Sequence, residues 1–186
     1  MTQEINTCIK ELQEGNLILY PTDTVWGIGC DATNPEAVKK VYQLKNREDS
    51  KALICLVAHQ AMLERHIEEV PDVAYDLIDL AEKPITIVFD QPKGIAKNLI
   101  AEDNTLAIRV ASDKFCQYLI NKFGKPIVST SANVSGMPTP KQFKEIAPEI
   151  LKGVDYVVNL PDENKNPSPS SIIKLGNDGQ VKVIRE

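Results

Sequence analysis

The chain has 186 residues, of which 42% are hydrophobic and 25% charged, and its formal net charge is −5 at pH 7. This length and composition predict one globular domain over residues 1–186, with a sizeable core. The acidic balance disfavours a protein that coats nucleic acid, although a local basic cleft remains compatible with it. No apolar run reaches the roughly 20 residues of a membrane span, and no signal peptide is recognisable. We therefore expect a cytoplasmic protein.

The spacing of the cysteines also fits a protein of the cytoplasm. The four cysteines, Cys8, Cys30, Cys55 and Cys116, are scattered and form no Cys-x-x-Cys pair. This pattern disfavours a zinc site or a disulfide framework and predicts reduced thiols in the core.

The predicted elements alternate between helices and strands. An amphipathic helix ends at Gly15, a strand covers 17–20, and Asn34 caps a helix that ends near Lys45. Further strands are expected over 53–57, 85–89, 105–110, 127–131, 155–159, 171–175 and 181–184, further helices over 59–67, 71–82 and 113–123, and a surface loop over 160–169. This mixture predicts the α/β class with a mixed sheet and flanking helices.

Two short runs lie where regular structure is expected to end: Lys45-Asn46-Arg47 and Ser129-Thr130-Ser131-Ala132-Asn133. Cations and neutral hydrogen-bonding groups at such positions are typical of a site for a phosphate-bearing ligand. A solvated helix end and a polar strand edge remain the alternatives. Both readings stay open on spacing alone.

Two further segments carry candidate contacts. Thr22, Asp23 and Thr24 follow a strand, where α/β sheets often bind ligands, but these residue types also favour a plain turn. In the strand 105–110, alternation puts Arg109 on one face with Ala107. If that face lines a cleft, Arg109 becomes a clamp for a carboxylate or phosphate; otherwise it is solvated or ion-paired.

Common catalytic motifs are missing from the sequence. It contains no Walker A loop, Rossmann glycine fingerprint or paired-histidine metal motif, and His59 and His66 are expected on the surface of a helical stretch. Chemistry would then depend on positioning and charge stabilisation, as in phosphoryl and nucleotidyl transfer.

The chain resembles the YrdC-type threonylcarbamoyl-AMP synthase family in its short single-domain form. The resemblance is carried, in family order, by Tyr20-Pro21-Thr22-Asp23-Thr24-Val25-Trp26-Gly27, Lys45-x-Arg47, Lys83-Pro84-Ile85-Thr86, Thr105 to Arg109 and Ser131-Ala132-Asn133-x-Ser135-Gly136. It implies a twisted mixed sheet around a concave basic cleft. It also implies a nucleotidyltransferase that forms L-threonylcarbamoyladenylate and pyrophosphate from L-threonine, bicarbonate or CO2, and ATP with Mg2+.

The product would serve the t6A modification at position 37 of tRNAs that read codons beginning with A, which implies a link to a t6A transferase complex. The alternative is a module of the same fold that binds double-stranded RNA or tRNA without synthase activity. The acidic total and the lack of basic runs count against this alternative.

The resemblance also implies roles for individual residues. The catalytic set is Lys45, Arg47, Ser131 and Asn133. The ATP contacts are Arg47, Lys51, Thr105, Asn133, Lys141 and Arg185. The L-threonine contacts are Thr24, Arg109, Ser131 and Ser170. No protein side chain is expected to ligate a metal.

Overall fold

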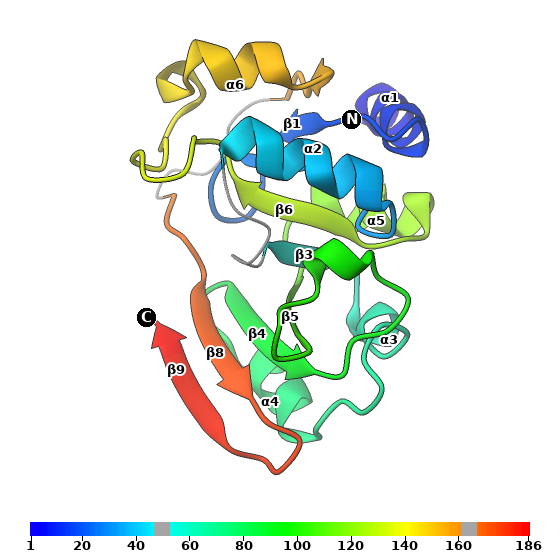
Figure 1. The fold of residues 1–186 in the computed structure, drawn as a ribbon, viewed down its shortest axis with the longest axis vertical. Helices are drawn as coiled ribbons and strands as arrows, with labels where there is room; N and C mark the ends of the chain where they lie inside the picture. The colour runs from blue at the N-terminus through cyan, green and yellow to red at the C-terminus, as the bar shows by residue number, and fades with distance from the viewer. Residues whose placement is uncertain (47–52, 161–166) are drawn as a thin grey trace.

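One continuous mixed sheet runs through the part of the chain that the structure describes, residues 1–46, 53–160 and 167–186 of the computed structural model (Figure 1). The strands are β1 (Ile18–Tyr20), β2 (Gly27–Gly29), β3 (Ile54–Val57), β4 (Ile85–Asp90), β5 (Thr105–Val110), β6 (Ile127–Ser131), β7 (Tyr156–Val157), β8 (Ser171–Leu175) and β9 (Val181–Arg185). Their order is β7-β1-β2-β6-β3-β5-β4-β8-β9. β3–β5 and β4–β8 are parallel, whereas β3–β6, β4–β5 and β8–β9 are antiparallel. This confirms a single α/β domain with a mixed sheet.

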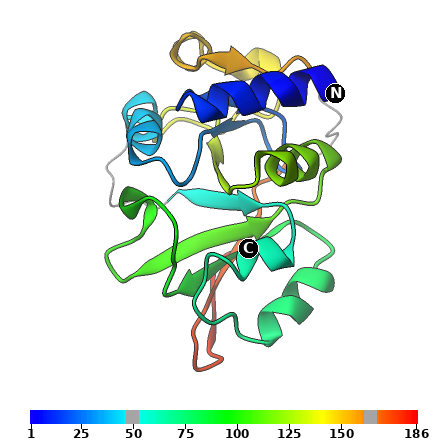
Figure 2. The same cartoon turned by 90° about the vertical axis from the view of Figure 1, so that its right-hand side faces the viewer.

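The helices are α1 (Thr2–Gln13), α2 (Pro35–Lys45), α3 (Gln60–Leu63), α4 (Val73–Asp79), α5 (Lys114–Phe123) and α6 (Pro148–Gly153), with short 3-10 turns η1 (Lys97–Leu99) and η2 (Phe143–Glu145). Figure 2 shows α1, α5, α3 and α4 together on one side of the sheet, and α5 and α3 contact β3. Among the described residues, no helix is both long and apolar enough to cross a bilayer.

Local signals explain where α2 begins and ends. The side chain of Asn34 accepts hydrogen bonds from the backbone N–H groups of Glu36 and Ala37, and Pro35 occupies the first turn. Asn46 closes the helix with φ of 50°. Lys45 is therefore the last helical residue, and its side chain starts from a fixed point of the fold.

Several predicted elements are confirmed to the residue, and others differ. Strands 105–110, 127–131 and 171–175 have the predicted bounds, as β5, β6 and β8. The helices expected over 59–67 and 71–82 are shorter. His59 precedes α3, where its Nδ1 accepts a hydrogen bond from the Met62 N–H, and His66 Nδ1 lies 3.2 Å from the Lys93 carbonyl oxygen. Both rings are half-buried rather than freely exposed. Most of the loop expected over 160–169 lies outside the described residues.

Strand alternation separates the two faces of the central sheet. Leu106 and Ile108 of β5 belong to the hydrophobic core, whereas Ala107 and Arg109 face the opposite side. The four cysteines are buried free thiols. Burial raises the pKa of Cys8 and of Cys55 to about 12, so these thiols stay protonated and unreactive near neutral pH.

Gly29 of β2 allows close packing in the upper half of the sheet. A Cβ atom there would lie 2.6 Å from Cε1 of Tyr20 and 2.8 Å from the Val128 carbonyl oxygen. Because Tyr20 is fully buried and its hydroxyl donates to that carbonyl, neither atom can move aside easily. We expect Gly29→Ala to lower the free energy of unfolding by about 2–3 kcal/mol in urea denaturation.

Gly27→Ala is the matched control for this prediction. It lies on the same strand, and its nearest neighbour would be the Cγ2 of Thr22 at 3.3 Å. It should therefore cost less stability than Gly29→Ala. Equal stability of the two variants would contradict the close-packing argument.

Candidate active site

A pocket of about 300 Å³ opens on the side of β5 that carries Ala107 and Arg109. Residues from distant parts of the chain line it, and the predicted ones among them are Thr24, Arg109, Ser131, Ser170 and Arg185. The described lining thus combines hydroxyl groups and two guanidinium groups with apolar side chains, and it includes no carboxylate. Such a lining suits an anionic ligand that also carries an apolar group.

Arg109 is buried and ion-paired beside this pocket. Its exposed fraction is 4%, and its Nη2 lies 3.2 Å from Oδ1 of Asp23, which is 6% exposed. Oδ2 of Asp23 accepts hydrogen bonds from the hydroxyl and the backbone N–H of Ser112, at 2.7 and 3.2 Å. The carboxylate is thus anchored itself and holds the guanidinium in place. The buried Nε of Arg109 has no hydrogen-bond partner among the described residues, which leaves a donor for a ligand.

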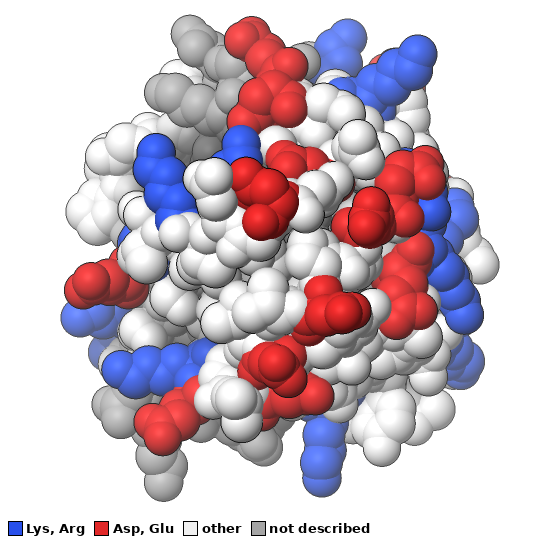
Figure 3. All heavy atoms as spheres, turned by 90° about the horizontal axis from the view of Figure 1, so that it is seen from below, with Lys and Arg blue, Asp and Glu red and all other residues white. Residues whose placement is uncertain are grey.

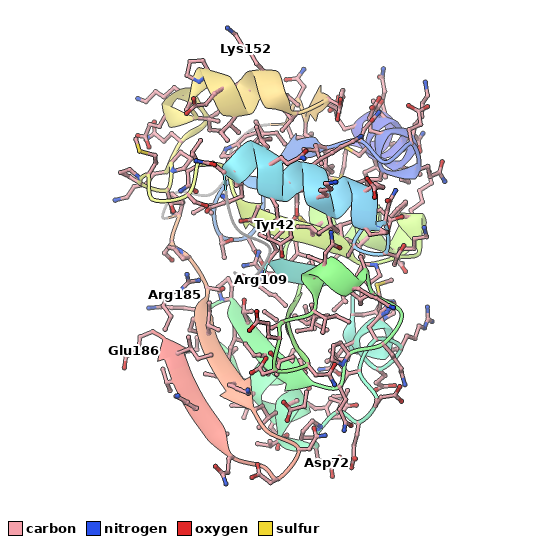
Figure 4. All side chains as sticks on the ribbon, in the orientation of Figure 1. Tyr42, Asp72, Arg109, Lys152, Arg185 and Glu186 are labelled. Carbon is pink, nitrogen blue, oxygen red and sulfur yellow. The ribbon has the colours of Figure 1, made fainter. Side chains whose placement is uncertain are left out.

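Arg185 provides a second cation from the last strand. Its Nε and Nη2 donate to the carbonyl oxygen of Ser170, at 3.0 and 2.7 Å. Figure 4 shows Arg185 and Arg109 at a similar height, between the upper and lower parts of the molecule. Burial, and then the charge of Arg109, lower the pKa of Arg185. An anion bound between the two guanidinium groups would offset this repulsion.

The segment between β1 and β2 brings Thr24 to the pocket. The Thr22 hydroxyl donates to the Val25 carbonyl oxygen at 2.7 Å, and its oxygen accepts from the Thr24 N–H at 3.0 Å. The hydroxyl oxygens of the two threonines are 2.9 Å apart. Thr22 thus organises the turn, while Thr24 lines the cavity. The turn interpretation is confirmed for Thr22, and a ligand contact of Thr24 stays a prediction.

Lys45 connects the two runs that were predicted as ligand-binding edges. Its exposed fraction is 2%, and its Nζ donates to the carbonyl oxygens of Ser131 and Asn133, at 2.5 and 2.6 Å. The Ser135 N–H donates in return to the Lys45 carbonyl oxygen at 2.8 Å. The end of α2 and the end of β6 are therefore fastened together. Neither Lys45 nor Asn133 lines the pocket itself.

Two further predicted residues, Lys141 and Thr105, belong to the described part of the chain and do not line the pocket. Lys141 borders a small crevice that shares Thr24 and Val25 with the pocket. Thr105 donates its hydroxyl to Oδ1 of Asp103 at 2.7 Å and does not line the pocket. Arg47 and Lys51 lie outside the described residues.

Sequence reasoning did not assign roles to Ser112 or Thr86. Ser112 anchors Asp23, and Thr86 contacts the hydroxyl of Ser170. The sequence did contain a signal for Thr86: it is a hydroxyl residue in the otherwise apolar run 85–89. Its hydrogen-bond partner, however, becomes apparent only in the folded structure.

The face shown in Figure 3 carries a different mixture of charges from the pocket lining, which contains arginines and no described carboxylate. Acidic residues are scattered across the middle of this face and most basic side chains lie toward its edges. The described residues of this face therefore form no broad basic surface for a nucleic acid backbone.

Comparison with known proteins identifies the family. The model of the Sua5/YciO/YrdC family, described as telomere recombination, matches residues 10–186. The chain belongs to this family.

A curated member of the Sua5/YciO/YrdC family, threonylcarbamoyl-AMP synthase of Photobacterium profundum, is 36% identical over 183 residues, which cover 90% of this chain and 96% of the relative. Among solved structures, an H234A/Y235A variant of P. abyssi Sua5 has a TM-score of 0.88 at 26% identity, covering 97% of this chain and 55% of that one. P. abyssi Sua5 complexed with L-threonine has a TM-score of 0.85 at 27% identity, covering 92% and 50%. The chain thus spans about half the length of these Sua5 chains.

Proposed function

We propose that the chain is an enzyme, an L-threonylcarbamoyladenylate synthase that joins L-threonine, bicarbonate-derived CO2 and the AMP moiety of ATP and releases pyrophosphate. The observation that carries this proposal is the convergence of Thr24, Arg109, Ser131 and Ser170 on one pocket. Relatives named threonylcarbamoyl-AMP synthase, and a family member solved with L-threonine, support the same activity.

The amino-acid half of the reaction would use Arg109. Its guanidinium is buried, is oriented by Asp23 and keeps a donor at Nε. Such a group is suited to bind the carboxylate of threonine. The hydroxyls of Thr24, Ser131 and Ser170 would bond the amine and the side-chain hydroxyl. The apolar lining residues would contact the methyl group.

The nucleotide half would use the neighbouring edge, where α2 meets the end of β6. Arg47 and Lys51 would neutralise the triphosphate, and Asn133 and Lys141 would contact the nucleotide. Lys45 would hold this edge together through its bonds to the carbonyl oxygens of Ser131 and Asn133. Arg185 would complete this half, because its guanidinium lines the pocket beside Ser170. Such cations stabilise the charge that develops on the phosphates in the transition state.

The chemistry would take two steps. The neutral amine of threonine attacks CO2 and loses a proton, which forms N-carboxythreonine. A carboxylate oxygen of this carbamate then attacks the α-phosphorus of ATP in line, and the bond to the pyrophosphate oxygen breaks. The protein supplies proximity and charge stabilisation in both steps, without a covalent nucleophile. The product would feed t6A formation at position 37 of tRNA.

Magnesium belongs to this proposal as a partner of the ATP phosphates. The described residues contain no group of three or more His, Cys, Asp or Glu side chains that could hold a metal, and the described pocket lining includes no carboxylate. This donor set does not fit a magnesium ion held by protein side chains. Magnesium would arrive bound to the nucleotide.

A pyrophosphate-release assay tests the function. With purified protein and Mg-ATP, we expect release only when both L-threonine and bicarbonate are present, and threonylcarbamoyl-AMP should be detected by mass spectrometry. Release that does not depend on threonine would contradict the proposal. Salt-sensitive binding of duplex RNA without turnover would favour the RNA-binding alternative.

A further inference from the structure

Thr86 lies beneath the pocket without lining it. It belongs to β4, on the same face as Val88, which does line the pocket. The antiparallel register pairs Ile87 with Ile108 and therefore sets Thr86 across from Arg109. Thr86 is nevertheless 0% exposed. Because Thr86 is inaccessible and does not line the pocket, its effect on a ligand would pass through a neighbour.

The Thr86 hydroxyl forms a hydrogen bond with one neighbour, the hydroxyl of Ser170. Its Oγ1 lies 2.7 Å from Oγ of Ser170, a pocket residue that is 2% exposed. Valine would fill the same space in an apolar strand without a polar group to satisfy, and burying a hydroxyl is unfavourable unless it is hydrogen-bonded. The contact with Ser170 therefore distinguishes threonine from valine at this position.

Either hydroxyl can donate in the free protein, and an acceptor in the pocket would select the direction. Each hydroxyl carries one hydrogen, and Thr86 Oγ1 makes no other hydrogen bond within the described residues. If Ser170 donated, the hydrogen of Thr86 would be left buried without an acceptor. If Thr86 donates, its hydrogen is satisfied and that of Ser170 remains for an acceptor in the pocket.

Ser170 is held from a second side as well. Its carbonyl oxygen accepts two hydrogen bonds from the guanidinium of Arg185. The backbone of Ser170 is thus fixed by Arg185 and its hydroxyl by Thr86. A hydroxyl that is held in this way loses little freedom when a ligand binds.

We propose that Thr86 is a positioning residue, which donates to Ser170 once substrate is bound and so directs the Ser170 hydrogen toward an acceptor oxygen of the amino-acid substrate beside Arg109. This inference rests on the proposed function. It assigns a role to the last residue of Lys83-Pro84-Ile85-Thr86, to which the sequence motifs gave none.

The test compares Thr86→Val, which removes the hydroxyl at nearly constant volume, with Thr86→Ser, which keeps it. We expect T86V to raise the Kd of L-threonine in calorimetry, and its KM in turnover, by about tenfold, with the KM for ATP unchanged. T86S should stay close to wild type. The double variant T86V/S170A should bind threonine no more weakly than S170A, because both changes act through one hydroxyl.

Other outcomes overturn the inference. A merely structural role would be indicated by any of three results. These are wild-type threonine affinity in T86V, additive effects of T86V and S170A, and an equal rise in the KM values for threonine and ATP. If T86V does not fold, T86C serves in its place, since its thiol is a weak donor of similar size. Wild-type protein that binds no threonine would overturn the proposed function itself, whereas threonine binding that ignores T86V overturns this inference alone.

Discussion

Replacing Arg109 with methionine is expected to lower kcat/KM for L-threonine by about a hundredfold or more. The side chain remains unbranched near the backbone but is shorter, and it loses the charge that would bind the substrate carboxylate in a buried pocket. The same change leaves Asp23 without the guanidinium that lies 3.2 Å away, so a fall in stability is also expected. Pyrophosphate release at saturating ATP and varied threonine measures the first effect, and urea denaturation measures the second.

Two variants serve as controls for Arg109→Met. Arg109→Lys keeps the charge but not the planar fork and should recover stability better than activity. Lys93→Met removes an ion pair with Glu68 whose side chains are 39% and 58% exposed, and it should change both quantities little. Folded Arg109→Met protein with unchanged dependence on threonine would refute the carboxylate assignment.

Replacing Lys45 with methionine should be comparably damaging, by about a hundredfold in turnover. The change removes both hydrogen bonds from Nζ to the carbonyl oxygens of Ser131 and Asn133 in a nearly fully buried place. The edge of the proposed nucleotide site would lose its connection to α2. Because we assign this edge to the nucleotide half, the KM for ATP should rise more than that for threonine, in initial-rate measurements with either substrate varied.

Lys40→Met is the matched control for Lys45. It lies on the same helix, and its Nζ likewise donates to a backbone carbonyl, that of Gly15, at 2.8 Å. We expect a loss of about 1 kcal/mol of stability from this variant and no change in kinetics. If Lys45→Met and Lys40→Met behave alike in turnover, Lys45 has a general structural role and not one in the site.

Much of the secondary structure could be read from local patterns. Asn34 and Pro35 mark the start of α2 because capping depends on neighbours along the chain. The alternation in β5 correctly put Ala107 and Arg109 on one face. The strands β5, β6 and β8, rich in β-branched and apolar residues, were recovered with their full bounds.

Two elements were missed for a physical reason. β2 is the short segment Gly27–Gly29, in which two glycines give no strand preference, and it forms because β1 and β6 pair with it on either side. α6 has 6 residues and packs through the buried Ile150. Segments this short depend on tertiary contacts more than on propensity.

In the candidate site, too, local patterns and tertiary contacts determined different features. Residue types and their order were enough to indicate an anion site at strand ends and, through the resemblance, its family. Folding adds the partners: Asp23 and Ser112 for Arg109, Thr86 and Arg185 for Ser170, and Lys45 for Ser131 and Asn133. Propensity and capping act between near neighbours in the chain, so sequence patterns reveal them. Hydrogen bonds across 84 or 86 residues depend on sheet order and strand register, which no local pattern encodes.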